Sequence, residues 1–291
     1  MKKYGYLPLG LFLLLLFTQV TYGQIKIGSK AGLSLGKLSD GSQNIYSRNS
    51  TSKSGLDFGI FMEIPVSAHF SVQPEGLLAN RGGKRNGLQP VDTGSIVDAL
   101  VANGLSLDVL NQLIIANGGS AITDANPLFA NFRNETDLNY LEIPILGKLT
   151  WGNNLRFYVN TGPYFGFLLK AHDKTKGSSK IYLDSGGTQP LQLPNPLFDP
   201  NNPNGQPPFI EFPEQSFDAN TDVKDGLRTF AFGVHTGLGV IKRLNSQHEL
   251  FFDVRGSYSF ISLQKNKVFG SSKVGGIIFS LGYTFALRKA R

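Results

Sequence analysis

The stretch that decides the fold is NYLEIPILGKLTWGNNLRFYVNTGPYFGFLLK, residues 139–170. Apolar side chains recur at every second position on both sides of Gly152-Asn153-Asn154. A period of two is the pattern of a β-strand with one apolar face, and a short turn rich in Gly and Asn joins antiparallel strands. The stretch therefore predicts a hairpin of two long strands, 139–151 and 155–170.

The same alternation recurs in six further segments, namely 25–35, 55–66, 70–81, 230–240, 249–260 and 276–285. The eight segments are about twice as long as the five or six residues of an ordinary strand. A tilted strand that crosses a membrane needs about 9–11 residues. The sequence therefore predicts an all-β fold, an eight-stranded antiparallel transmembrane β-barrel.

The connections between these segments alternate strictly between short and long. The long ones are about 36–54, 82–138, 171–226 and 263–273. Outer-membrane barrels have short periplasmic turns and longer external loops, so we expect both termini at the periplasmic end. A soluble β-sandwich is the alternative, but it has no reason to sort its loops by length.

Two of the expected external loops are long enough to contain structure. Apolar residues at helical spacing predict short helices over 95–102 and 106–116, with Ser106 as the N-cap of the second. The loop 171–226 holds eight of the fifteen prolines. That composition predicts extended or disordered chain there.

The first 23 residues have the layout of a signal peptide. A basic start, Met1-Lys2-Lys3, precedes an apolar run from Leu7 to Phe17, and small residues stand at the −3 and −1 positions in Thr21-Tyr22-Gly23. We expect cleavage after Gly23 and a barrel domain over 24–291. An uncleaved anchor is the alternative, but a membrane-spanning helix takes roughly 20 apolar residues.

The net charge of +7 first suggests an anionic partner such as nucleic acid. Lys2 and Lys3 lie in the expected signal peptide, and three more bases lie in the tail after Phe285. The two longest loops, 82–138 and 171–226, carry a combined charge of −7. The expected outer surface is therefore acidic, and no nucleic-acid partner is predicted.

Thirteen charged side chains fall on the inward-facing positions of the predicted strands. They are seven bases and six acids, namely Lys26, Lys30, Asp57, Glu63, Glu75, Arg81, Glu142, Lys148, Arg156, Lys170, Glu249, Asp253 and Arg255. An eight-stranded barrel is only just wide enough for side chains to fill, and an unpaired charge in so confined a space costs several kcal/mol. We therefore predict a structural network of paired charges that plugs the barrel. A narrow conduit lined by the same groups is the alternative.

The sequence predicts no catalytic, cofactor or metal site. There is no Cys, and the four His residues show no ligand spacing. Gly32–Gly36 matches the G-x-S-x-G motif of a nucleophile elbow, but it lies along a predicted strand instead of a strand-to-helix turn. Asp199–Gly205 resembles a calcium loop with its glycine out of register.

Several stretches are similar to a known family. Residues 139–149, NYLEIPILGKL, resemble the "YLEIPxLxK" strand of the PorT-like outer-membrane β-barrel family of Bacteroidota, whose members are often termed "porin family". GLDFGIFME (55–63), VQPE (72–75), VNTGPYFGFLL (159–169) and the closing GYTF (282–285) fit the same family. The resemblance implies an envelope protein without catalytic residues, and one branch is similar to an accessory factor for protein secretion. The helical insert, the Pro-rich insert and the tail after Phe285 depart from the family pattern.

The sequence thus predicts a non-enzymatic outer-membrane protein whose barrel contacts outer-membrane lipid. Its external loops are expected to bind a partner, and an envelope or secretion-system protein is the candidate. A minor porin-like channel for small solutes is the alternative. Single-channel recording of the refolded protein separates the two readings. A packed polar plug gives little or no steady conductance, whereas large, stable open steps would contradict the plug.

Overall fold

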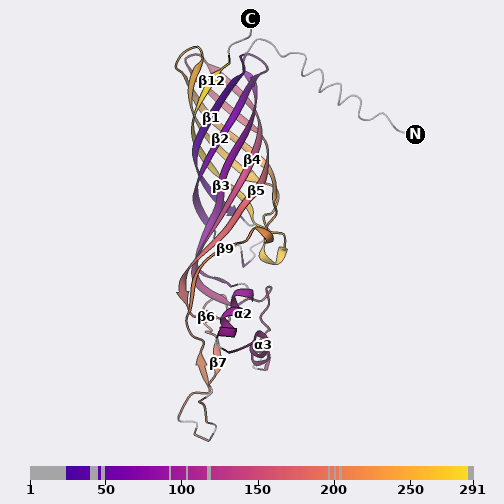
Figure 1. Ribbon diagram of the computed structural model, residues 1–291, viewed down its shortest axis with the longest axis vertical. Coiled ribbons are helices and arrows are strands. Elements are labelled where there is room, and N and C mark those ends of the chain that lie inside the picture. The colour runs from indigo at the N-terminus through magenta and orange to yellow at the C-terminus, as the bar shows by residue number, and fades with distance from the viewer. Residues whose placement is uncertain are drawn as a thin grey trace, which may run out of the picture.

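Eight antiparallel strands close into a ring in the computed structural model, which describes residues 24–39, 45–46, 50–91, 93–102, 104–116, 119–195, 197–199, 201–202 and 205–287 (Figure 1). The strands of the ring are β1 (Lys26–Ser39), β2 (Thr51–Pro65), β3 (Phe70–Pro90), β4 (Phe129–Gly152), β5 (Leu155–Ser179), β10 (Phe230–Arg243), β11 (His248–Ser259) and β12 (Lys273–Ala286). Their order is β4-β3-β2-β1-β12-β11-β10-β5, and β5 pairs back with β4. The predicted eight-stranded antiparallel barrel is confirmed.

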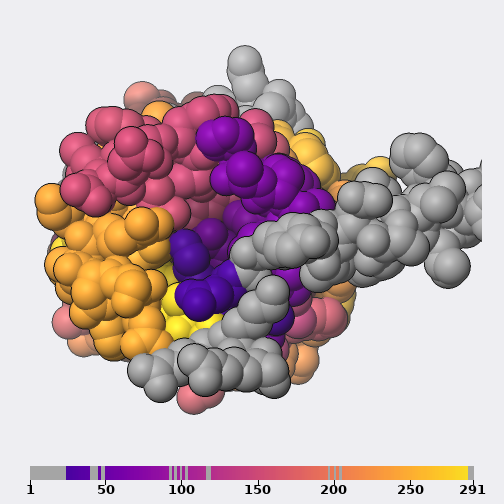
Figure 2. Space-filling model, turned by 90° about the horizontal axis from the view of Figure 1, so that it is seen from above, coloured from indigo at the N-terminus to yellow at the C-terminus, as the bar shows by residue number. Residues whose placement is uncertain are grey.

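The two ends of the barrel differ. Short turns join β2 to β3, β4 to β5 and β10 to β11 at the end where β1 starts and β12 finishes, with Lys26 opposite Ala286. Viewed from this end, the colours pass around the ring until yellow β12 meets indigo β1 (Figure 2). The long connections leave from the opposite end (Figure 1).

Three strands run much farther than the sequence pattern indicates. β3, β4 and β5 have 21, 24 and 25 residues, and the β3–β4 ladder continues to the pair Pro90 and Phe129. The expected loop 82–138 therefore begins and ends as strand, and loop 171–226 begins as strand. The ends of β1 and β2 likewise extend into 36–54, and β12 begins at the last residue of 263–273. Polar residues such as Lys84, Glu135 and Lys174 replace the apolar ones there. The apolar alternation ends at the edge of the apolar belt, the band of apolar side chains on the outer face of the barrel. The hydrogen-bonded pairing of the strands continues beyond this edge.

The remaining elements lie beyond the barrel mouth. The two predicted helices are confirmed as α2 (Thr93–Ala102) and α3 (Leu107–Ala116), and the Val109 amide donates to Ser106 Oγ at 3.3 Å as an N-cap. The Pro-rich segment is not bare chain. It contains β6 (Ile181–Tyr182), the β7–β8 hairpin (Gln192–Pro194 and Phe209–Glu211), β9 (Gln215–Asp222), which pairs with β5, and the short helix η1 (Lys224–Gly226). A second short helix, η2 (Lys267–Phe269), precedes β12.

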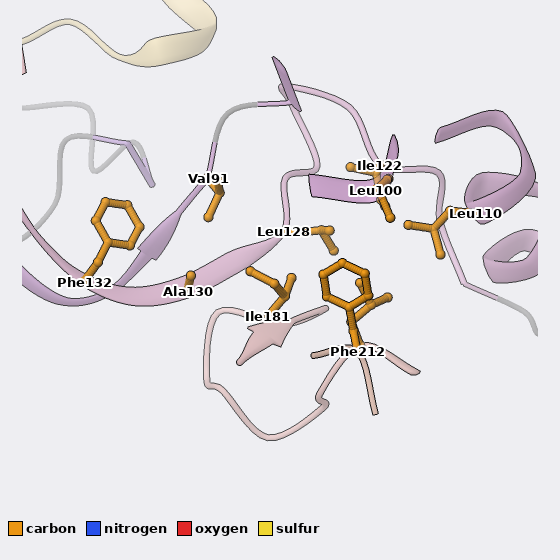
Figure 3. Packing of buried hydrophobic residues seen from close by; sticks show 10 residues of the cluster. Val91, Leu100, Leu110, Ile122, Leu128, Ala130, Phe132, Ile181 and Phe212 are labelled. Carbon is orange, nitrogen blue, oxygen red and sulfur yellow. The ribbon is translucent and has the colours of Figure 1, made fainter. Parts of the chain in front are cut away.

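These outer elements enclose a hydrophobic core of their own, which we term the external cluster (Figure 3). Its buried members are Val91, Leu100, Leu110, Ile122, Leu128, Ala130, Phe132, Ile181, Leu191 and Phe212. They come from both helices, from the ends of β3 and β4, and from the Pro-rich segment. Burial of apolar side chains from segments this far apart in sequence gives the outer part a packed, defined structure.

The barrel wall is apolar outside and polar inside. Large apolar side chains along the outer face remain exposed, among them Leu33, Leu56, Ile60, Leu238 and Leu281, each more than half exposed. The opposite positions of the same strands carry buried polar and charged groups. This inversion of the usual soluble pattern suits a wall that faces hydrocarbon.

Inward-facing glycines make room for aromatic rings near the turn end of the barrel. Phe61 and Phe251 stack edge to face with ring centroids 5.5 Å apart. A Cβ on Gly282 would overlap the ring of Phe251 and approach the backbone oxygen of Ser29 to 2.7 Å. The absence of a side chain at Gly282 is therefore a packing requirement.

We predict that Gly282→Ala lowers the free energy of unfolding by about 1–3 kcal/mol, because the added methyl group overpacks this site. Gly76→Ala is the matched control, since no atom lies within 4 Å of the position its Cβ would take. Denaturant unfolding of the protein refolded in lipid vesicles measures both. Equal stabilities for the two variants would contradict the packing argument.

Candidate functional site

The charged side chains of the lumen form three connected layers. The first lies at the turn end, where β1, β2, β4, β5 and β11 each contribute one group. Lys26 Nζ lies 3.0 Å from Glu249 Oε2 and 3.8 Å from Glu63 Oε1. Lys148 Nζ lies 2.6 Å from Glu63 Oε2, and Arg156 Nη2 lies 2.5 Å from Glu249 Oε1. Each carboxylate thus serves two buried bases on different strands, and the exposed Arg243 also lies 3.8 Å from Glu249 Oε1.

The second layer lies in the middle of the barrel and centres on Glu75, whose side chain is fully buried. Lys30 Nζ and Arg255 Nη1 approach Glu75 Oε2 at 2.7 and 2.9 Å. Arg255 Nη2 also lies 2.6 Å from Asp253 Oδ2. The Tyr158 hydroxyl donates to Asp253 Oδ1 at 3.0 Å. The layer therefore joins β1, β3, β5 and β11 across the lumen.

The third layer lies nearer the end of the barrel from which the long connections leave, and it centres on Arg81. Its Nη1 donates to both carboxylate oxygens of Asp57 at 2.7 and 2.8 Å, and its Nη2 donates to Glu142 Oε2 at 2.9 Å. His235 Nε2 lies 3.3 Å from the same Glu142 oxygen, and its ring packs 4.5 Å from that of Tyr164. The side chain of Arg81 is only 1% exposed, so its charge is neutralised by protein groups instead of water.

The structure brings together twelve of the thirteen expected side chains and leaves out Lys170. A β-bulge interrupts the β4–β5 pairing, since Asn139 faces Lys170 while Tyr140 faces Leu168. The extra residue, Leu169, shifts the inward positions of β5 by one. Lys170 therefore lies on the exposed side and does not belong to the lumen network.

Without Lys170 the network has six bases and six acids. Equal and opposite charges matter here because the effective cost of removing an ion from water is several kcal/mol, and only well-placed partners offset it. Every base in the three layers lies within 4 Å of an acid. The lumen is thus filled by a network that is neutral as a whole.

Several members of the site lie outside the thirteen expected charges. Gln73 links the first two layers, because Nε2 donates to Glu75 Oε1 at 2.7 Å while Oε1 accepts from Lys148 at 3.3 Å. Asn160 donates to Asp253 at 3.2 Å. Lys53, in the expected loop 36–54, is buried beside Asp137 at 2.5 Å. The alternation of β3 and β5 does place Gln73 and Asn160 inward, whereas nothing in the sequence shows that β2 extends to Lys53.

The described residues hold no group of three or more His, Asp or Glu side chains arranged to bind a metal ion. None of the helices described in the structure is both long enough and apolar enough to cross a membrane.

The family of the chain follows from its sequence as well as its fold. The family model "Outer membrane protein beta-barrel domain" matches residues 17–265, and the chain belongs to this family. The protein is therefore an outer-membrane β-barrel of the bacterial outer membrane. No curated protein sequence matches the chain.

Solved structures with a similar fold are also outer-membrane proteins. Neisserial surface protein A is 8% identical, with 90% of this chain and 97% of that chain covered and a TM-score of 0.36. The attachment invasion locus protein Ail of Yersinia pestis is 11% identical, with 91% and 100% covered and a TM-score of 0.34. OprG from Pseudomonas aeruginosa is 9% identical, with 93% and 99% covered and a TM-score of 0.39. Likeness at this level transfers no function.

We predict that Arg81→Gln destabilises the barrel by about 3–5 kcal/mol, because it leaves Asp57 and Glu142 buried without a cation. Adding Asp57→Asn and Glu142→Gln to Arg81→Gln is expected to restore part of the lost stability, because the two unpaired buried charges are then removed. Lys84→Gln is the control, since Lys84 and Glu135 form a partly exposed pair at 3.5 Å that is worth about 1 kcal/mol or less. Urea unfolding in lipid vesicles measures the series. A loss for Arg81→Gln no greater than that for Lys84→Gln would contradict this account.

Proposed function

We propose that the protein is a non-enzymatic surface protein in which the barrel anchors a folded external domain that binds another protein of the cell envelope. The external cluster is the observation that carries the proposal. A barrel that only needed to close its strands could do so with short turns, yet this chain builds a second apolar core from both helices, the ends of β3 and β4 and the Pro-rich segment. Rigidly held loops on a barrel are where binding surfaces usually lie.

The lumen supports the role of an anchor over that of a channel. The side chains of Glu75, Arg81, Glu142, Asp253 and Arg255 are all at most 3% exposed, so these groups face one another instead of a water column. A porin-like channel needs an aqueous path through the same three layers. The anchor is therefore the function that the geometry favours.

The orientation of the external domain follows from the general topology of outer-membrane barrels. Short turns lie on the periplasmic side in such proteins, which directs α2 and α3 to the cell surface. Residues 1–23 and the proposed cleavage site after Gly23 lie outside the described residues. Export by a signal peptide is part of the proposal.

The helices α2 and α3 offer exposed apolar side chains to a partner. Val101 is 63% exposed, Val109 45% and Ile115 56%, although the same helices bury Leu100 and Leu110 in the external cluster. Asp98 and Asp108 of the same helices are exposed as well. Exposed apolar side chains together with polar ones are typical of protein-binding surfaces. A partner that presents apolar and basic groups complements these helices.

The resemblance to the PorT-like family of Bacteroidota adds the kind of partner to the proposal. One branch of that family is similar to an accessory factor for secretion across the outer membrane. A component of a secretion system is accordingly the first candidate for the protein that binds α2 and α3.

We predict that Val109→Lys combined with Ile115→Lys abolishes chemical crosslinking to the partner in intact outer membranes. The two charges break an apolar contact but leave the buried face of α3 unchanged. Leu197→Lys is the control, since Leu197 is 75% exposed in the connection between β7 and β8. Mass spectrometry of the crosslinked species identifies the partner. Capture of the same proteins by all variants, or of none by the unmodified protein, would contradict the proposal.

A further inference from the structure

A cavity of about 730 Å³, which we term the vestibule, lies between the barrel mouth and the external cluster. Its floor includes Leu38, Val223 and Leu227, which pack on a second buried apolar cluster whose members include Leu138, Leu168 and Leu263. Its far wall includes Phe132 and Ile181 of the external cluster. Ligand pockets usually measure about 300–1,000 Å³, so the vestibule has the size of a small-molecule site.

One side of the vestibule is the inner face of the strand extensions. The register places Arg85 of β3 opposite Asn134 of β4, which in turn faces Thr175 of β5. Asp173 of β5 lies between Thr136 of β4 and Thr221 of β9. All six residues line the cavity. The bulge that turns Lys170 outward is the same feature that turns Asp173 and Thr175 inward.

Two of these side chains carry opposite charges without hydrogen-bonded partners. Among the described residues, no group forms a hydrogen bond or ion pair with the Arg85 guanidinium. Asp173 Oδ1 is buried and likewise accepts no hydrogen bond. Burial lowers the pKa of Arg85, and the charge of Asp173 acts in the opposite direction. Both residues are half-buried and line the cavity, so their charged groups retain unused capacity to bind a ligand.

The apolar parts of the vestibule complete the chemistry. Phe132 and Phe217 stack with ring centroids 4.7 Å apart at the far end, and leucines form the floor. Apolar surface at both ends therefore flanks a band of hydroxyl, amide and charged groups, in which Lys84, Asp98 and Asp218 accompany Arg85 and Asp173. A guanidinium matches a carboxylate with two parallel hydrogen bonds, and a carboxylate oxygen accepts from an ammonium group.

We propose that the vestibule binds a short peptide with free termini and apolar side chains, whose carboxylate pairs with Arg85 and whose ammonium group pairs with Asp173. Each terminal charge of such a peptide then lies against a group of opposite charge. The apolar side chains of the peptide pack on the leucines of the floor or on the stacked Phe132 and Phe217. Asp98 of α2 lines the vestibule, but the exposed apolar residues of the two helices, Val101, Val109 and Ile115, do not. If the vestibule binds no peptide, the proposal of a protein partner on α2 and α3 still stands. If that partner is not found, the peptide site still stands.

Isothermal titration of the refolded full-length protein in detergent micelles tests the proposal with three probes. The probes are the tripeptide Leu-Leu-Leu, its N-acetylated form and its C-terminal amide. We expect saturable binding of the free tripeptide and at least about a tenfold loss of affinity for each blocked form, because each has lost one charge-assisted hydrogen-bonded pair.

Variants assign each terminus to its residue. The Arg85→Gln variant is expected to bind the free tripeptide and its C-terminal amide with equal affinity. The Asp173→Asn variant is expected to bind the free tripeptide and its N-acetylated form with equal affinity. Lys176→Gln and Glu214→Gln are matched controls at exposed positions, and they are expected to keep the full preference. Circular dichroism confirms that each variant retains its sheet content.

Failure of the unmodified protein to bind any of the three peptides would overturn the proposal. So would equal affinity for the free and blocked forms, or an unchanged preference in Arg85→Gln and Asp173→Asn.

Discussion

The rest of the structure depends on the neutralisation of charge inside a barrel too narrow to hold free water around every ion. Six bases and six acids meet there in three layers, and the pairs join residues far apart in sequence. Lys26 and Glu249 are 223 residues apart, and Glu75 and Arg255 are 180 apart. Each pair forms only when the strands have the right neighbours in the right register. A slip of one residue would turn every charge of a strand toward the apolar outer face.

The wall and the network depend on the same alternation. Outward positions carry Leu, Ile and Phe in the belt, and inward positions carry charges, glycines and a few large aromatic rings. Gly282 and Gly28 leave space for Phe251 and Phe61, so the lumen is packed by shape as well as by charge. Beyond the belt the outward apolar residues cease, but β3, β4 and β5 continue as a polar sheet that supports the external cluster. One set of long strands thus joins an anchor to a folded outer domain.

Much of this was open to prediction from the sequence, because a strand with one apolar face leaves a period of two in the chain. That period gave the eight strands, their inward charges and the ends at which the turns lie. This period does not predict the extensions of β3, β4 and β5, because Lys84, Glu135 and Lys174 interrupt the apolar pattern while the backbone pairing continues. The alternation places Lys170 in the lumen, which is wrong. A bulge depends on the pairing of two strands, and the local sequence pattern of one strand does not predict it. The external cluster and the vestibule arise from contacts among residues far apart in sequence, such as Leu110, Ile181 and Phe212. Such contacts leave no periodic pattern in the sequence.

The central claim is that the lumen is closed by its own side chains. The chain has no native Cys, so Ser280→Cys introduces a single thiol, in the lumen where Ser280 is 4% exposed. Ser246→Cys places one in the exposed turn between β10 and β11. The rate of reaction with a charged thiol reagent in the refolded protein reports access to each position. A closed lumen predicts that the thiol at 246 reacts readily, while the thiol at 280 reacts only after unfolding. Comparable rates at both positions in the folded barrel would contradict the account.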